Sequence, residues 1–386
     1  SRAACAPWCW AESLHTNGRQ RLSEALLVLA DGSVYRGEAV GADGFADGEV
    51  VFNTSMTGYQ EMLTDPSYAG QLLVLTYPLI GNYGIDERVE ESGRVQPSGL
   101  IVREASVYAS HLRSHHTIRD YLRAKGIVAI AGVDTRAITR NIRRHGVMPG
   151  TISTTETPEE ALARLRALPG YDDVNWVDTV TTDRVFDWAT PAGEARHRVA
   201  LLDGGVKRNI MRSLEARGCS VRVFPASTSA EEILALKPDG IVLSPGPGDP
   251  RLLDAMVGEV GRIIGKAPIL GICLGHQVAA RALGAGTFKL PFGHRGGNHP
   301  VQDLATGRVT ITAQNHGYAV DPDGLNAAAY VSHINLNDQT VEGVAMKDEP
   351  LMTIQYHSEA CPGPLDNEYI FDRFVAMMTS VRGGVR

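Results

Sequence analysis

The sequence predicts an α/β protein in which a C-terminal open, mostly parallel sheet flanked by helices follows an N-terminal β-rich α/β domain. The chain has 386 residues, which is more than one domain usually holds. After residue 198, short apolar runs alternate with helix-like stretches, an order that is typical of parallel sheets with right-handed crossovers. Before residue 172, strand-like runs dominate.

The N-terminal half is predicted to open with a β-hairpin, because apolar runs at 26–30 and 33–37 flank the turn pair Asp31-Gly32. Two helices are expected: one over 117–125, and one that begins at the capping box Thr157-Pro158-Glu159-Glu160 and ends at Pro169-Gly170. Further strands are predicted at 72–77, 99–102 and 127–131.

Four segments follow from this pattern. Residues 1–21 have neither a secretory h-region nor a folded-element pattern, so we expect a disordered extension. Residues 22–172 form the N-terminal domain, and the polar segment 173–197 is interpreted as a linker. The C-terminal domain spans 198–386. Its strands are predicted at 199–203, 221–225, 240–243 and 267–272, and helix-like stretches begin near Asn209, Ser229 and Leu252.

Composition narrows the class of protein. The formal net charge is −7, with no basic run, so binding to nucleic acid or an anionic membrane is not expected. No apolar run reaches the ~18–20 residues that span a bilayer. The five cysteines are an odd, scattered set, which favours a reducing cytoplasm over a disulfide framework.

The segment 267–277 (APILGICLGHQ) predicts a nucleophile elbow. A buried-type strand ends at Ile272, a helix begins after Cys273, and Gly271 and Gly275 stand two residues away on either side. Such a turn holds the thiol out of the sheet, small neighbours admit substrate, and the helix N-terminus favours the thiolate. Taken alone, the pattern also fits a buried, inert cysteine.

A base and its partner are predicted after the strand at 351–356. His357 and Glu359 are two residues apart at the strand exit, so both side chains can reach one rim of the sheet. A carboxylate beside an imidazole fixes its tautomer and stabilises the imidazolium. Alone, H-x-E also fits a surface ion pair.

A rigid Pro/Gly loop, 244–250 (SPGPGDP), ends another strand and could donate N–H groups to an oxyanion. It is not a phosphate loop, because G-x-x-x-x-G-K-[ST] does not occur. Four histidines, His276, His294, His299 and His316, match no metalloenzyme spacing, so no metal site is expected.

Three segments together resemble the triad-type (class I) glutamine amidotransferases: 271–277, 244–250 and 357–359. Three more segments resemble one family of this class, the carbamoyl-phosphate synthetase small chain: 293–300, 314–320 and 359–364. Its N-terminal domain is similar at 50–61 (VVFNTSMTGYQE), 64–68, 76–82 and 132–140 (GVDTRAITR). The resemblance runs from about residue 26 to about 378.

The resemblance implies a class I amidotransferase fold and a set of site residues. Cys273 would be the nucleophile, His357 the acid/base and Glu359 its orienting partner, with the Leu274 and Gly246 N–H groups as oxyanion hole. The glutamine-binding residues would be Ser67, Gly246, Gly248, Leu274, Gln277, Asn315, Gly317 and Tyr318. Three positions depart from the family pattern: Ser358 and Pro245 remove no reacting group, and Tyr318 adds a hydroxyl near the substrate.

The resemblance also implies partners. L-glutamine would be hydrolysed here, the N-terminal domain would dock a large subunit, and ATP and Mg²⁺ would bind that subunit, with no cofactor in this chain. The carbamoyl phosphate formed would serve arginine or pyrimidine biosynthesis. Two alternatives stay open: a stand-alone Cys-His-Glu hydrolase, which leaves the N-terminal domain unexplained, and a catalytically silent regulatory subunit, which leaves Cys273 unexplained.

Overall fold

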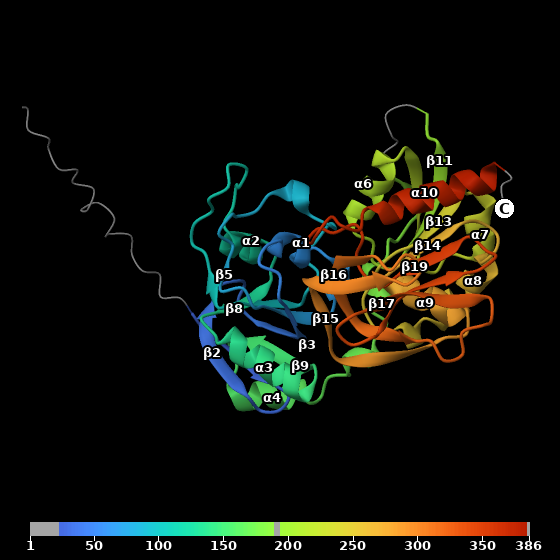
Figure 1. Ribbon diagram of the computed structural model, residues 1–386. Coiled ribbons are helices and arrows are strands. Elements are labelled where there is room, and N and C mark those ends of the chain that lie inside the picture. Colours follow the sequence, from blue (N-terminus) through green and yellow to red (C-terminus); the bar gives the residue numbers. More distant parts are fainter. Residues whose placement is uncertain (1–22, 189–193, 384–386) are drawn as a thin grey trace, which may run out of the picture.

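A closed β-barrel and an open, helix-flanked sheet lie side by side (Figure 1) in the computed structural model, which describes residues 23–188 and 194–383. The extension predicted for 1–21 lies outside the described residues. Within the described ranges, no helix combines the length and apolar character needed to cross a bilayer.

The predicted N-terminal hairpin is confirmed. Strands β1 (Glu24–Leu29) and β2 (Val34–Ala39) pair antiparallel. The turn between them contains Gly32 at φ 87°, a left-handed conformation that glycine adopts without the steric cost of a side chain.

The barrel closes because β1 also pairs with the last strand of this half, β9, with Leu26 opposite Ser153. The β-rich character is as predicted, but local patterns did not predict the closure, since it joins segments more than 120 residues apart. In spatial order after β1 and β2, the barrel strands are β8 (Val128–Ala131), β6 (Gly99–Ile101), β4 (Gln71–Leu75), β3 (Phe45–Asn53) and β9 (Met148–Ser153).

Short helices surround the barrel. Two were predicted: α2 (Ile118–Ala124), capped by Thr117, and α4 (Pro158–Leu165), whose capping box is formed by Thr157 and Glu160. The second helix ends at Leu165, before the expected stop at Pro169-Gly170. The other small elements of this half are α1 (Tyr59–Leu63), α3 (Thr135–His145), β5 (Leu79–Ile80), β7 (Glu104–Ala105), η1 (Pro66–Tyr68), η2 (Glu87–Val89) and η3 (Tyr171–Asp173).

The segment interpreted as a linker contains two elements, α5 (Val177–Val180) and β10 (Phe186–Asp187). The second of them pairs antiparallel with β12, so it is an edge strand of the C-terminal sheet. Trp176 packs on both halves: a Cβ added at Gly70 would lie 2.4 Å from its ring, and one at Gly248 3.4 Å.

The C-terminal sheet has ten strands, and the prediction of a mostly parallel sheet is only partly right. The central strands pair in parallel in the order β12 (Cys219–Pro225), β11 (His197–Asp203), β13 (Gly240–Leu243), β14 (Ile269–Ile272) and β19 (Leu351–Ile354). An antiparallel group extends this centre: β15 (Gly286–Asp303), β16 (Val309–Asp321), β17 (Ala329–Asn335) and β18 (Val341–Met346). The apolar-run signal did not predict this extension, because its strands carry many polar residues.

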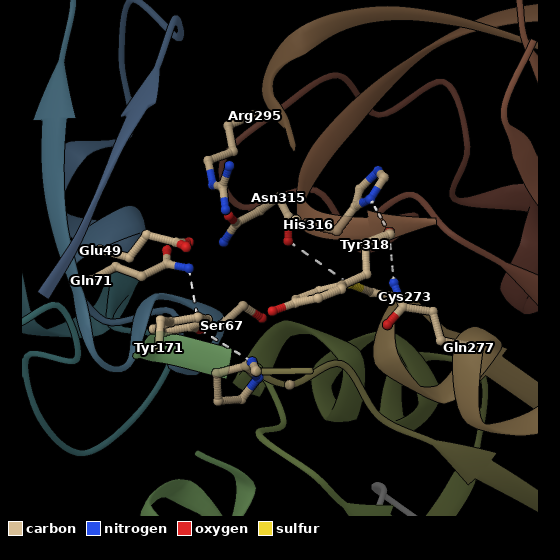
Figure 2. Close-up of a pocket in the computed structure, with 14 residues that line it drawn as sticks. Glu49, Ser67, Gln71, Tyr171, Cys273, Gln277, Arg295, Asn315, His316 and Tyr318 are labelled. Carbon is tan, nitrogen blue, oxygen red and sulfur yellow. Dashed lines mark hydrogen bonds between the residues drawn. The ribbon is translucent and has the colours of Figure 1, made fainter. Parts of the chain in front are cut away.

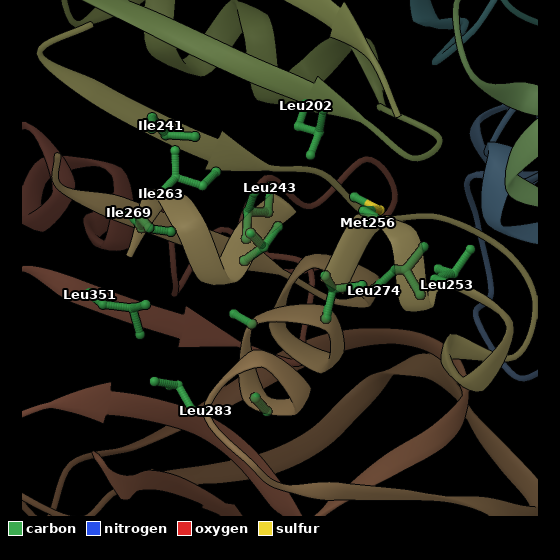
Figure 3. Close-up of a cluster of buried hydrophobic side chains, with 14 of the residues drawn as sticks. Leu202, Ile241, Leu243, Leu253, Met256, Ile263, Ile269, Leu274, Leu283 and Leu351 are labelled. Atoms are coloured by element: carbon green, nitrogen blue, oxygen red, sulfur yellow. The ribbon is translucent and has the colours of Figure 1, made fainter. Parts of the chain in front are cut away.

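Helices cover both faces of the parallel centre, and successive residues of a strand pack alternately on the two faces. Leu202 and Leu243 lie in the core beneath α8 and α9 (Figure 3), whereas Leu201 and Val242 face the opposite core. The first layer consists of α7 (Ala230–Ala235), α8 (Asp254–Ile263) and α9 (Leu274–Ala282), with η4 (Pro250–Leu252) nearby. The second layer consists of α6 (Arg208–Ala216) and α10 (Tyr369–Arg382).

Buried polar contacts join the two halves. The Asp65 side chain, 3% exposed, accepts from the Ser67 N–H through Oδ1 at 2.9 Å and from Asn315 Nδ2 through Oδ2 at 2.8 Å. Glu91, 1% exposed, accepts from the Asn209 N–H and pairs with Arg212 at 3.0 Å. The Asp65 carboxylate therefore connects elements of both halves at the pocket described next.

Candidate active site

Cys273 stands at the sharp turn between β14 and α9. Its backbone has φ 52° and ψ −107°, a conformation that residues with a side chain rarely adopt, and its N–H donates to the Ile354 carbonyl at 2.9 Å. The sequence prediction of a strand–turn–helix elbow is thus confirmed in its backbone geometry. Backbone strain of this kind concentrates at functional sites.

The glycines around Cys273 have a different role from the one expected. A Cβ at Gly275 would lie 2.2 Å from the Leu243 carbonyl oxygen, and one at Gly271 would lie 2.8 Å from the Gly275 oxygen. They therefore let α9 pack against the ends of neighbouring strands, rather than making room for substrate.

His357 and Glu359 follow β19 and are almost fully buried. The imidazole Nδ1 lies 2.6 Å from Glu359 Oε1, which fixes the tautomer with the proton on Nδ1, and no hydrogen-bond partner within the described residues reaches Nε2. Burial lowers the pKa of His357, but the Glu359 carboxylate and the nearby Cys273 thiol outweigh burial and raise it. The electrostatics therefore favour an imidazolium beside the sulfur.

Lys207 completes this group and was missed by sequence reasoning. Its side chain is 2% exposed, its Nζ lies 3.1 Å from Glu359 Oε1, and it also donates to the Ala360 carbonyl. Burial raises the pKa of Glu359, but Lys207 and His357 outweigh it and lower the pKa. A lysine in the turn after β11 has no local signal of burial, because only the tertiary fold brings it beneath the carboxylate.

Gly246 lies against Leu274, as an oxyanion hole made of their N–H groups requires. A Cβ at Gly246 would lie 2.6 Å from the Leu274 side chain and 2.2 Å from the Gly204 carbonyl oxygen, so only glycine fits there. Leu274 is the first residue of α9, so its N–H has no partner within that helix.

A pocket opens beside Cys273 between the two halves (Figure 2). Seven of the eight glutamine-binding residues implied by the resemblance line it, and Leu274 does not. They are Ser67, Gly246, Gly248, Gln277, Asn315, Gly317 and Tyr318. The sequence did not identify five further lining side chains: Glu49, Gln71, Tyr171, Arg295 and His316. Arg295 and His316 lie in the resembling segments 293–300 and 314–320, whereas Glu49, Gln71 and Tyr171 lie outside every motif of the sequence.

The contacts of the pocket residues decide which atoms face a ligand. Gln277 Nε2 donates to the Tyr318 carbonyl at 2.9 Å and to Gln355 at 3.0 Å, so its Oε1 is the atom open to a substrate. The Tyr318 hydroxyl donates to Asp172. The hydroxyl that distinguishes Tyr318 from the family pattern is therefore tied to the barrel half.

Several buried polar atoms of the pocket wall lack a partner within the described residues: Ser67 Oγ, Gln71 Oε1 and Arg295 Nε. Buried polar groups in proteins are nearly always hydrogen-bonded. A small polar ligand in this pocket would supply the missing partners, which fits an amino-acid substrate better than an apolar one.

The sheet, the elbow and the buried His–Glu pair define the class of protein as a class I glutamine amidotransferase, and that family profile matches residues 200–377. A second profile, the carbamoyl-phosphate synthase small chain, CPSase domain, matches residues 27–152. The carbamoyl phosphate synthase small chain of Syntrophotalea carbinolica is 49% identical over 93% of this chain and 99% of its own length. That of Listeria monocytogenes is 50% identical over 94% and 99%.

This chain therefore belongs to the carbamoyl-phosphate synthase small chain family. Among solved structures, a glutamine amidotransferase from Thermotoga maritima is similar at a TM-score of 0.35 and 17% identity, over 50% of this chain and 87% of that one.

Proposed function

We propose that this chain is the glutamine-hydrolysing subunit of carbamoyl-phosphate synthase, releasing ammonia for a large ATP-dependent subunit. The observation that carries this proposal is the Cys273 elbow beside a buried His357–Glu359 pair and a polar pocket. Membership of the family supports the same activity. The two alternatives, a stand-alone hydrolase and a silent subunit, gain no support from any contact at the site.

In the proposed mechanism, the Cys273 thiolate attacks the side-chain amide carbon of glutamine. The N–H groups of Leu274 and Gly246 stabilise the oxyanion that forms. His357 gives its proton to the leaving nitrogen, so ammonia departs and a glutamyl thioester remains. His357 then takes a proton from water, whose hydroxide adds to the thioester carbon and releases glutamate and the thiolate. Glu359, held by Lys207, keeps the imidazole oriented.

The pocket wall would hold the rest of the glutamine. The proposed substrate-binding residues are Ser67, Gly246, Gly248, Leu274, Gln277, Asn315, Gly317 and Tyr318. Ser67 Oγ, which has no hydrogen-bond partner in the described part of the chain, offers a hydrogen bond from the barrel half. Because the wall comes from both halves, substrate binding depends on their relative position.

Two adjoining cavities support a route by which ammonia leaves. Behind His357, one cavity is lined by Asp65, Lys207 and Pro362 among others. Pro362 also lines a second, wider cavity between barrel residues such as Gln60 and the segment 360–365, in which Leu365 is 64% exposed. We assign the rim of this cavity to docking of the large subunit, which would bind ATP and Mg²⁺.

The domain organisation is part of the proposal: residues 22–172 dock the large subunit, 173–197 connect the halves, and 198–386 hydrolyse glutamine. Three cysteines within the described residues, Cys219, Cys273 and Cys361, are free thiols. Thiols suit a reducing compartment, so we propose the cytoplasm.

The proposal is tested by measuring glutamate release from glutamine by the full chain, alone and with the purified large subunit. We expect slow turnover alone and a marked increase with the partner. Fast turnover that the partner does not change would indicate a stand-alone hydrolase. The absence of turnover in both conditions would indicate a silent subunit.

A further inference from the structure

Three antiparallel strands bring a buried His-His-Glu cluster together beneath the glutamine pocket. His294 on β15 and His316 on β16 are directly opposite in the strand register, and Glu342 lies on β18. One side-chain donor atom from each residue lies within 4.8 Å of the others. The three side chains are 7%, 5% and 0% exposed.

Hydrogen bonds fix the tautomers of both histidines. His294 Nε2 lies 2.8 Å from Asp338 Oδ2, and His316 Nδ1 lies 2.8 Å from the Tyr318 carbonyl oxygen. Both oxygens can only accept, so these nitrogens carry the protons. The opposite nitrogens, His294 Nδ1 and His316 Nε2, keep their lone pairs, and neither has a hydrogen-bond partner within the described residues. Metal-binding histidines show the same pattern, with the second nitrogen bound to a carboxylate or a carbonyl.

Glu342 supplies a negative charge that needs compensation. Its two oxygens accept from Asn335 Nδ2 and Gln314 Nε2, each at 2.9 Å, and both donors are neutral amides. His294 Nδ1, at 3.8 Å, is the basic group that pairs with it within the described part of the chain. A buried carboxylate is costly unless a cation lies nearby.

We propose that His294, His316 and Glu342 bind a divalent transition-metal ion, with Zn²⁺ as the best match to two imidazoles and one carboxylate. His299 lies nearby, with its ring centroid 5.1 Å from that of His294, but it is not one of the three residues whose donor atoms lie within 4.8 Å of one another. The β15–β16 register is irregular on both sides of His294, and such irregularities are frequent near functional sites.

The metal would act on the glutamine pocket through the chain rather than by touching the substrate. His316 belongs to the segment 315–318, all four residues of which line the pocket. An ion bound to His316 would therefore restrain the position of this segment. The sequence spacing did not predict this site, because its ligands come from three separate strands.

The test is the Zn²⁺ affinity of the full chain, measured by competition with a chromophoric chelator. We expect about one Zn²⁺ per chain. His294→Asn and Glu342→Gln each remove a ligand and should weaken affinity by more than about 100-fold, and Asp338→Asn, beyond the ligands, by about 10–100-fold. His197→Asn is the matched control, because His197 is also buried with an unpartnered Nδ1 but lies outside the cluster.

A second measurement does not depend on how the variants fold. Wild-type protein loaded with Co²⁺ should show the visible absorption of cobalt bound by nitrogen and oxygen, and Zn²⁺ should displace it. Equal Zn²⁺ uptake by wild type, His294→Asn and Glu342→Gln, or no cobalt band in wild type, would overturn the proposal. The cluster would then be a protonated histidine held between two carboxylates.

Discussion

The two halves of the molecule contribute to one pocket in different ways. The sheet half carries the proposed reacting groups, Cys273 and His357, at the carboxyl ends of neighbouring parallel strands, where open sheets place their chemistry. The barrel half contributes wall residues such as Ser67 and Gln71, and its one lining carboxylate, Glu49, is paired with Lys289. The difference teaches that chemistry and substrate recognition are divided between the halves, so substitutions in each should change different kinetic constants.

The largest effect is expected in the sheet half. Cys273→Ser replaces the thiol by a poor nucleophile at the same position and should lower kcat for glutamate release by about 10⁴-fold or more. The control is the synthesis of carbamoyl phosphate by the reconstituted complex from added ammonia, which should persist. Undiminished glutamate release would remove Cys273 from the mechanism.

The second effect concerns stability in the same half. Lys207→Met leaves the Glu359 carboxylate, 0% exposed, with His357 as its remaining buried cation and should lower the free energy of unfolding by about 3 kcal/mol. Urea denaturation measures the change. As a control, Arg217→Ala breaks the more exposed pair with Asp372 and should cost about 1 kcal/mol or less. Equal costs for the two variants would contradict this assignment.

A smaller effect is expected from the barrel half. Ser67→Ala removes a pocket hydroxyl that has no partner among residues 23–188 and 194–383. It should raise the KM for glutamine by about 10-fold, the value of one hydrogen bond to substrate, with little change in kcat. Ser33→Ala, in the distant hairpin turn, serves as the control. If Ser67→Ala lowered kcat and left KM unchanged, the division between the halves would be wrong.

Stability in the sheet half should also depend on pH through His357. Its pKa is raised to about 10, so its protonation stabilises the fold fully below the ordinary unfolded pKa of about 6.5. This contribution is lost as the pH rises through the folded pKa. The Tm difference between wild type and His357→Asn should therefore shrink from pH 6.5 towards pH 10. A difference that grows over this range would contradict the raised pKa.

Local signals predicted much of the fold. The turn at Asp31-Gly32, the capping box at Thr157, the helix start near Ser229 and the strand–turn–helix around Cys273 each follow from a few neighbouring residues, and each is present. The class of protein also follows from contiguous motifs.

What was missed depends on pairing over long distances. Three features bring together segments that no local periodicity connects. They are the barrel closure through Leu26 and Ser153, the buried contact of Lys207 with Glu359, and the contact of His294 with Glu342. Polar, irregular strands such as β15 also lack the alternation that identifies a half-buried strand.

The carboxylate of Asp65 joins a barrel turn to the pocket wall, with one oxygen on each. Hydrogen bonds weaken steeply once the atoms separate by a few tenths of an ångström, so the contact with Asn315, which crosses between the halves, does not tolerate their relative shift. Any protein that binds the barrel and rotates it relative to the sheet half would therefore change the position of Asn315. Contact with a partner at a distant surface would then change substrate affinity.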